Sequence, residues 1–131
     1  MSKLFIDSNI IFHFFSSDEL KADKSEEILA NGSIISVQVL NEVVAVCRRK
    51  LKLSWNEIDV LLVALKANLQ IVPLTVTSHA LAIKLCKQYQ LSFYDTHICS
   101  GGLIAQSSKL ISEDMQDGLS VDSLLIQNQF K

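Results

Sequence analysis

Apolar residues occur along this chain in two kinds of segment that alternate. Short apolar runs bounded by polar residues predict buried strands, and they occupy residues 4–6, 33–36, 71–72, 109–111 and 124–126. Longer segments with apolar residues at helical spacing predict helices, over residues 9–15, 20–30, 37–50, 54–66, 77–89 and 92–105. The polar segment 112–118 predicts a loop, because its residues are those of turns.

The alternation of strands with helices predicts a parallel sheet covered by helices. We expect an α/β fold, a three-layer α/β/α sandwich with a central, mainly parallel sheet of four or five short strands. Local signals support these boundaries, because Gly32 can end the second helix in a left-handed conformation and Ser54 with Glu57 has the pattern of a capping box. No linker or repeat divides the sequence, so residues 1–131 are expected to form a single domain.

Composition narrows the class of protein further. Hydrophobic residues make up 49% of the chain and charged residues 20%, which suits a sheet buried on both faces and a buried dimer interface. No apolar run approaches the roughly 18 residues of a membrane span, and no signal peptide precedes the first strand. Three widely spaced cysteines, Cys47, Cys86 and Cys99, indicate buried thiols in a reducing compartment. A cytoplasmic protein is therefore expected.

Four acidic residues stand out by their positions. Asp7 and Asp114 follow strand-like runs, Asp95 opens a helix, and Glu42 interrupts an apolar helix. In open α/β sheets, functional sites form at the carboxyl ends of strands, where Asp7 and Asp114 both fall. Carboxylates gathered at one place repel one another, and a divalent metal relieves that repulsion. The pattern favours metal-dependent chemistry on phosphate esters.

Each acid also has a purely structural interpretation. Asp7 can cap the first helix, Asp95 can complete a capping pattern begun by Ser92, and Asp114 lies among turn residues. Glu42 is the hardest to explain in this way, because its helix is apolar on most sides and an unpaired buried charge is costly. A partner or a metal is therefore expected beside Glu42.

The surroundings of these acids disfavour several other chemistries. Phosphatases of the haloacid-dehalogenase type need a second acid two residues after the first, to protonate the leaving group. That position is Asn9 in this chain. No glycine-rich phosphate loop, serine nucleophile elbow or histidine zinc motif occurs. The net charge of −2 counts weakly against a nucleic-acid partner, although an acidic site would itself lower that charge.

A basic run ends the third predicted helix, and its members are Arg48, Arg49, Lys50 and Lys52. Cations at a helix C-terminus complement the helix dipole, which is one interpretation of the run. Contact with RNA phosphates beside the acids is the other. A polar surface stripe formed by Gln38, Glu42 and Arg49 also remains possible on this helix.

Four segments containing these acids resemble, in order and spacing, the motifs of the PIN domain family. They are residues 4–10, 35–42, 92–95 and 112–118, so the resemblance covers nearly the whole chain. The chain looks most like the single-domain toxins of the VapC type from bacterial toxin–antitoxin pairs. This resemblance implies a Mg²⁺- or Mn²⁺-dependent endoribonuclease that leaves 5′-phosphates, forms a homodimer and is inhibited by a VapB-like antitoxin.

The resemblance also implies roles for individual residues. It gives the catalytic and metal-ligand roles to Asp7, Glu42, Asp95 and Asp114. Asn9 and Ser112 match positions that support the acids by hydrogen bonding, and Asp117 matches an acid that joins the site in some members. The physical logic agrees, because Mg²⁺ prefers carboxylate oxygens and can activate water for attack on a phosphodiester.

The segment after Asp95 departs from the family pattern. His97 could reach the acids or pack beside them. Gly101 and Gly102 each cost about 1 kcal/mol in a helix relative to alanine, so they permit close packing, for example at a dimer interface, or mark a segment that has drifted. The alternative function is a catalytically weakened or inactive PIN-like module that dimerises and binds RNA or an antitoxin. A phosphatase or a DNA-directed nuclease is a third use of the same acids.

Overall fold

A computed structural model describes residues 3–130 of the chain, so Met1 and Ser2, which precede the first strand, lie outside it. Within this range six short strands form one sheet in the order β3-β2-β1-β4-β6-β5. The strands are β1 Leu4–Ile6, β2 Ser33–Ser36, β3 Gln70–Val72, β4 Lys109–Ile111, β5 Ser120–Val121 and β6 Leu124–Gln127. Every pair is parallel except β5 with β6.

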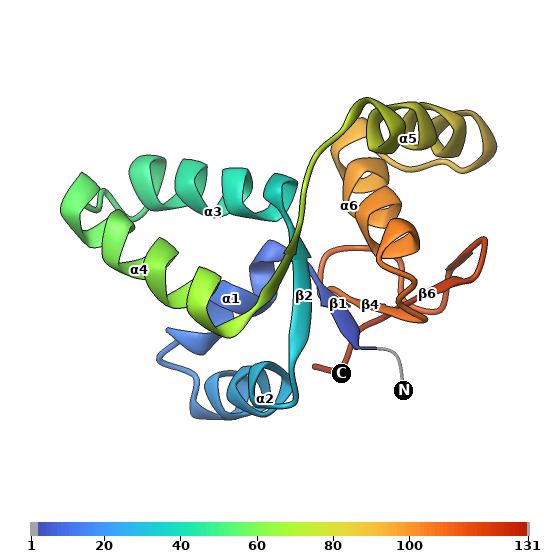
Figure 1. Cartoon of the computed structure of the whole chain (residues 1–131). Coiled ribbons are helices and arrows are strands. Elements are labelled where there is room, and N and C mark those ends of the chain that lie inside the picture. Colours follow the sequence, from blue (N-terminus) through green and yellow to red (C-terminus); the bar gives the residue numbers. More distant parts are fainter. Residues whose placement is uncertain (1–2, 131) are drawn as a thin grey trace.

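Six helices in the described range cover this sheet. They are α1 Ser8–Phe14, α2 Glu19–Ala30, α3 Val37–Arg49, α4 Trp55–Asn68, α5 Val76–Gln88 and α6 Phe93–Ile104. In Figure 1, α1 to α4 lie on one side of β2, and α5 and α6 lie on the other. The predicted α/β sandwich with a mainly parallel sheet is confirmed.

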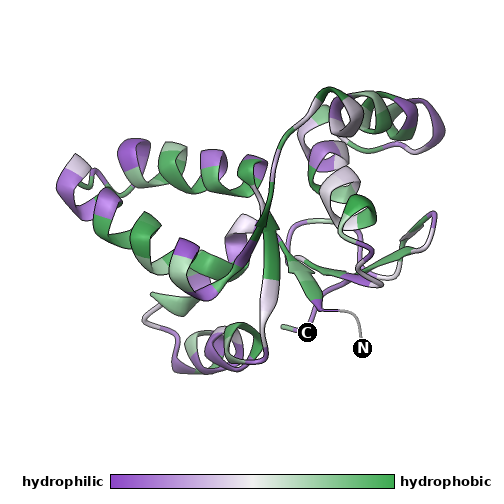
Figure 2. Cartoon of the chain, in the orientation of Figure 1, coloured by the Kyte–Doolittle hydropathy of each residue, from purple (hydrophilic) through white to green (hydrophobic). Residues whose placement is uncertain are grey.

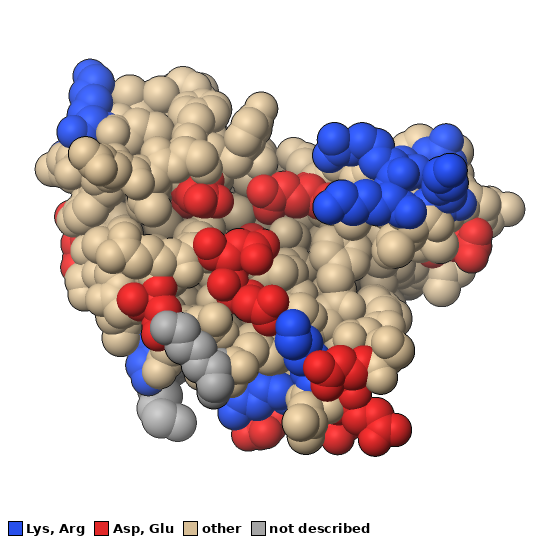
Figure 3. All heavy atoms as spheres, turned by 180° about the vertical axis from the view of Figure 1, so that it is seen from behind, with Lys and Arg blue, Asp and Glu red and all other residues tan. Residues whose placement is uncertain are grey.

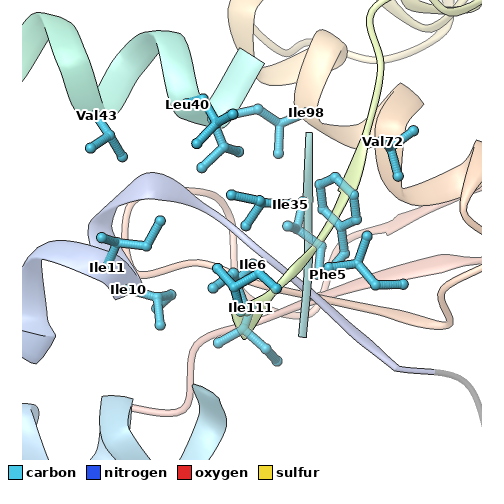
Figure 4. Close-up of a cluster of buried hydrophobic side chains, with 14 of the residues drawn as sticks. Phe5, Ile6, Ile10, Ile11, Ile35, Leu40, Val43, Val72, Ile98 and Ile111 are labelled. Atoms are coloured by element: carbon cyan, nitrogen blue, oxygen red, sulfur yellow. The ribbon is translucent and has the colours of Figure 1, made fainter. Parts of the chain in front are cut away.

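The core lies between β1, β2 and β4 and the helices that pack on them. Phe5, Ile6 and Ile35 are fully buried in the strands, and Ile11 and Val43 approach them from α1 and α3 (Figure 4). Figure 2 shows why these elements assemble, because the strands are mainly hydrophobic while the helices carry both hydrophobic and hydrophilic residues. Burial of the apolar side of each helix against the sheet is the main stabilising contribution.

Gly101 and Gly102 are explained by the packing of α6 on the sheet. A Cβ at Gly101 would lie 2.9 Å from Cζ of Phe5, and one at Gly102 would lie 3.0 Å from Cδ2 of Leu124. Both glycines are buried within the chain, so the close packing they permit is intramolecular. The two glycines lower the helix propensity of α6, but they allow it to lie close to β1 and β6.

The local predictions agree with the structure at most boundaries. Ser54 and Glu57 form the capping box that begins α4, and Gly32 adopts φ +79° after α2. The expected four or five strands are six, because the two-residue β5 was missed. Its sequence, Ser120-Val121, is too short for periodicity to reveal, and its pairing is antiparallel to β6 across a turn where Asp122 has φ +53°.

Two of the three cysteines are buried, as expected. All three thiols are free; Cys47 and Cys99 are buried and Cys86 is partly buried. None of the helices in residues 3–130 is long and apolar enough to cross a membrane.

Candidate functional site

Asp7 stands at the carboxyl end of β1, next to the end of β4. The register pairs Ile6 with Ile111, so the residues that follow them, Asp7 and Ser112, emerge side by side. Asp7 begins α1 as its N-cap, and its Oδ1 accepts a 2.7 Å hydrogen bond from the backbone N–H of Ser8. The structural interpretation of Asp7 as a cap is therefore correct, and it does not exclude a place in the site.

Ser112 holds Asp7 and shapes the loop after β4. Its hydroxyl donates to Oδ2 of Asp7 at 2.8 Å, and its Oγ accepts from the backbone N–H groups of Asp114 and Met115, each at 3.2 Å. One buried side chain thus ties an acid of β1 to the turn that carries Asp114. Such hydrogen bonds are what a supporting residue would make, and the role of Ser112 in a functional site stays a prediction.

Asn9 bridges the same two acids. Its Nδ2 lies 3.3 Å from Oδ2 of Asp7 and 3.3 Å from Oδ2 of Asp114, and 3.4 Å from Oγ of Ser112. Its Oδ1 accepts from the backbone N–H of Glu113 at 3.2 Å. An amide has two N–H hydrogens, so three acceptors share them. Asn9 therefore offsets part of the repulsion between Asp7 and Asp114.

Glu42 comes from α3, whose buried residues Val39 and Val43 lie on and next to the side that carries Glu42. Burial raises the pKa of Glu42 to about 7, with further contributions from the charges of Asp7 and Asp95, although a hydrogen bond from the Ser8 side chain opposes the change. The Oε2 atom is buried and has no hydrogen-bond partner among the described residues. A buried carboxylate oxygen of this kind is costly unless a proton or a cation reaches it.

Asp95 joins the group from the first turn of α6. The Oγ of Ser92 caps this helix and accepts from the backbone N–H of Asp95 at 3.1 Å. Burial raises the pKa of Asp95, and the charge of Asp114 adds to the effect against the lowering influence of Ser92. The backbone half of the predicted capping pattern is thus present, and the carboxylate senses both Ser92 and the charge of Asp114.

Three of the four predicted acids, Asp7, Glu42 and Asp95, have pKa values raised by the charges of other acids of the set. The pKa of Asp7 is raised by burial, despite hydrogen bonds from Ser112 and Ser8, and also by the charges of Asp95 and Asp114. Asp7, Glu42 and Asp95 therefore each have a pKa raised by the charge of another acid of the set, and Asp114 acts on Asp7 and Asp95. Neighbouring carboxylates with raised pKa values make this end of the sheet a candidate site.

The donor atoms suit a hydrated divalent cation. No three His, Cys, Asp or Glu residues within residues 3–130 are close enough to hold one ion between them. The cluster nevertheless offers only hard oxygen donors and one buried oxygen without a partner, on Glu42. Mg²⁺ keeps several waters and binds directly to only one or two carboxylates. The residues present therefore fit such an ion with water completing its coordination.

Two other predicted residues, Asp117 and His97, have contacts outside the four acids. The Oδ1 of Asp117 accepts from the backbone N–H of Asn128 at 2.8 Å, which anchors the segment after β6. His97 packs against Phe93 and His79, with ring centroids 4.4 Å and 5.7 Å away. Burial lowers the pKa of His97, and nearby His79 adds to this. His97 therefore belongs to an aromatic cluster beside the acids.

The basic run divides into two parts. The guanidinium of Arg48 lies 4.6 Å from the centre of the Trp55 ring and donates to the carbonyl of Leu53 at 3.0 Å, so it stabilises the turn between α3 and α4. The other three cations are exposed: Arg49, Lys50 and Lys52. Figure 3 shows acidic side chains near the middle of one face and basic side chains gathered at its end, over the junction of α3 and α4.

The sequence did not predict two ion pairs that Glu113 makes in the loop after β4. Glu113 pairs with Nε2 of His13 at 2.8 Å and with Nζ of Lys21 at 3.4 Å. His13 lies in α1 and Lys21 lies in α2, so these ion pairs attach the loop between Ser112 and Asp114 to both helices. The only sequence signal was the position of Glu113 next to Asp114, and nothing in the sequence named its partners.

The sequence profile described as PIN domain matches residues 4–116 of the chain. No curated protein sequence gives a significant match. Among solved structures, a toxin–antitoxin complex from Klebsiella pneumoniae is 17% identical with a TM-score of 0.71, over 93% of this chain and 95% of that one.

Two further structures share the fold. DNA-bound VapBC from Salmonella typhimurium has a TM-score of 0.71 at 13% identity, over 98% of both chains. VapC20 from Mycobacterium tuberculosis, described as a sarcin–ricin loop cleaving toxin, has a TM-score of 0.63 at 12% identity, over 82% of this chain and 86% of that one.

Proposed function

This chain belongs to the PIN domain family, and from that premise we propose that it is a metal-dependent endoribonuclease, the toxin of a toxin–antitoxin pair. The observation that carries the proposal is the convergence of four carboxylates at the carboxyl edge of the sheet: Asp7, Glu42, Asp95 and Asp114. Asn9 and Ser112 organise two of them.

The proposed metal ligands are those four acids, with Mg²⁺ or Mn²⁺ as the cofactor. A bound divalent ion would lower the pKa of water and stabilise charge on the phosphate. Asp7 is kept in place by the Ser8 and Ser112 hydrogen bonds. Glu42, with its pKa near 7, exchanges its proton readily near neutral pH. Asp117, which anchors the segment after β6, stays a proposed accessory acid only.

RNA is the proposed substrate, and Arg49, Lys50 and Lys52 are proposed contacts to its phosphates. Arg49 follows Glu42 by seven residues, so it lies on the same side of α3 about 10 Å further along the helix. A strand held at the acids could pass this cation on its way across the face in Figure 3. Arg48 is the weakest of the predicted contacts, because Trp55 and Leu53 already engage it.

An antitoxin partner and a homodimer complete the proposal. The similar structures from Klebsiella pneumoniae and Salmonella typhimurium are toxin–antitoxin assemblies, which supports a VapB-like partner for this chain. A cytoplasmic location agrees with the free thiols.

The direct test is RNA cleavage by the purified chain with Mg²⁺ or Mn²⁺ and with EDTA. We expect cleavage to require the metal, to leave 5′-phosphates, and to fall by at least a hundredfold in Asp7→Asn and Asp95→Asn. Asp59→Asn is the matched control, because Asp59 is exposed on α4 away from the acids. Equal cleavage by all four proteins would assign the activity to a contaminant and refute the proposal.

The alternative function is an inactive PIN-like module that dimerises and binds RNA or an antitoxin. The spacing of the carboxylates favours it, since no three of them in residues 3–130 already surround one ion. A ligand that binds the native state must stabilise it. Thermal unfolding that does not respond to millimolar Mg²⁺ or Mn²⁺, in a chain that still binds RNA, would favour this module over the enzyme.

A further inference from the structure

An aromatic cluster lies beside the acids at the start of α6. Phe93 contacts the His97 ring edge-on, with centroids 4.4 Å apart and planes at 90°. Tyr94 contacts Phe93 at 5.9 Å and 64°, and His79 of α5 closes the group at 6.0 Å from Phe93. The four rings form one connected set whose innermost member, His97, is 9% exposed.

The outer rings of this cluster are unusually exposed. Tyr94 is 63% exposed and Phe93 is 40% exposed, although the turn that carries them is fixed by the Ser92 cap. Their mutual contacts hold them in place without covering them. A rigid exposed ring loses little conformational entropy when a flat partner binds, because only two torsions need to be fixed.

The position of these rings links them to the site. Tyr94 and Asp95 are consecutive residues, so the ring and the carboxylate rise from the same turn of α6. Asp95 senses the charge of Asp114 and contributes to the raised pKa of Asp7 and Glu42. A base next to a phosphate held at the acids is therefore the candidate partner of the Tyr94 ring.

We propose that Tyr94, braced by Phe93 and His97, is a stacking platform for one unpaired base next to the scissile phosphate. This inference rests on the proposed ribonuclease function and defines its substrate more closely, as RNA that is single-stranded at the cleavage point. Bases stack on aromatic side chains without sequence preference, because every base has a π-face. A base within a duplex is already stacked on both sides and would not engage the ring.

A protein partner is the competing occupant of the same rings, whether a second copy or an antitoxin. The nucleic acid is favoured by continuity with the carboxylates, since the residue after Tyr94 is itself part of the cluster. A flat base needs only one exposed ring and its edge contacts, which the structure provides. The experiment below separates the two occupants.

The test uses short single-stranded RNAs carrying 2-aminopurine at successive positions, bound to the full chain in an Asp7→Asn background that prevents cleavage. In that background we expect quenching at one position, retained in Tyr94→Phe and lost in Tyr94→Leu, with affinity about five- to a hundredfold lower in the leucine variant. Phe15→Leu is the matched control, because Phe15 is 62% exposed but lies at the end of α1.

A double-mutant cycle gives a readout that a structural role would not move. An abasic nucleotide at the quenched position should weaken binding by the same factor as Tyr94→Leu, and the two changes together should cost no more than either alone. The thermal midpoint of Tyr94→Leu should stay within a few degrees of the parent, because the ring is mostly exposed.

Several outcomes would overturn the stacking proposal. Metal-dependent cleavage by the wild-type chain, with no quenching or no effect of Tyr94→Leu, would refute it and leave the ribonuclease standing. A change of oligomeric state or of antitoxin affinity in Tyr94→Leu, with RNA binding unchanged, would assign the rings to a protein interface. Absence of both RNA binding and cleavage would refute the two proposals together.

Discussion

Replacing Glu42 with glutamine should stabilise the metal-free protein above neutral pH. Burial and the charges of Asp7 and Asp95 raise the pKa of Glu42 from 4.5 to about 7. A carboxyl group whose pKa is raised by folding destabilises the native state where it is ionised. The cost is absent below pH 4.5, grows as the pH rises towards 7, and is complete above that value. Glutamine has nearly the same shape and no charge.

The magnitude follows from the two pKa values. The interval from 4.5 to about 7 corresponds to about 3 kcal/mol, at about 1.4 kcal/mol for each tenfold change in the ionisation constant. Glu42 is only half-buried, so water screens part of this interaction. We therefore expect Glu42→Gln to raise the free energy of unfolding by about 1–2 kcal/mol at about pH 8, and by about a quarter of that amount at about pH 5.

Urea unfolding in EDTA at these two pH values measures the effect. Asp59→Asn serves as the control and should change stability little at either pH, because Asp59 is exposed on α4. Saturating Mg²⁺ should reverse the order of the two proteins, since the wild type gains a ligand that the glutamine variant binds less well. A difference between the glutamine variant and the wild type that is the same at both pH values, or a variant less stable than the wild type at alkaline pH, would refute the account of Glu42.

Three further predictions follow from contacts in and near the site. Asn9→Ala removes the bridge between Asp7 and Asp114, so metal affinity measured by calorimetry should fall about 10- to 100-fold; unchanged affinity would contradict the bridging role. Gly101→Ala places a Cβ 2.9 Å from Phe5, and overpacking should lower stability in urea by about 1–2 kcal/mol despite better helix propensity. Mg²⁺ affinity should also fall as the pH drops below about 7, where a proton occupies Glu42, and a flat profile in wild type would contradict this.

The arrangement of strands and helices was accessible from sequence because local and global signals agree in this chain. Apolar runs such as that ending at Ile6 are bounded by capping residues, and the Ser54 capping box marks the start of α4. The short strand β5 was not accessible, since two residues carry no periodicity and its pairing with β6 depends on a turn at Asp122. The sheet order likewise depends on contacts distant in sequence.

The candidate site was accessible in part for a similar reason. Asp7 and Asp114 follow strands that became neighbours, and parallel packing alone brings such ends together. The bridge made by Asn9 joins residues more than a hundred positions apart, so a linear pattern contains no sign of it. The same holds for the pairing of Glu113 with His13. The sequence pattern therefore identifies the charged residues, whereas their hydrogen-bond and ion-pair partners are seen only in the structure.

Asp7 both caps α1 and senses the charges of other acids. This combination has an evolutionary consequence. Asparagine caps a helix about as well as aspartate, so a change of one base in the codon could remove the charge and keep the cap, with loss of the hydrogen bonds that Oδ2 accepts from Ser112 and Asn9. Selection on folding would oppose that change less than a change that also removes the cap. Descendants that have exchanged catalysis for mere binding should therefore arise easily at this position, and they would persist as stable proteins that sequence comparison alone still groups with nucleases.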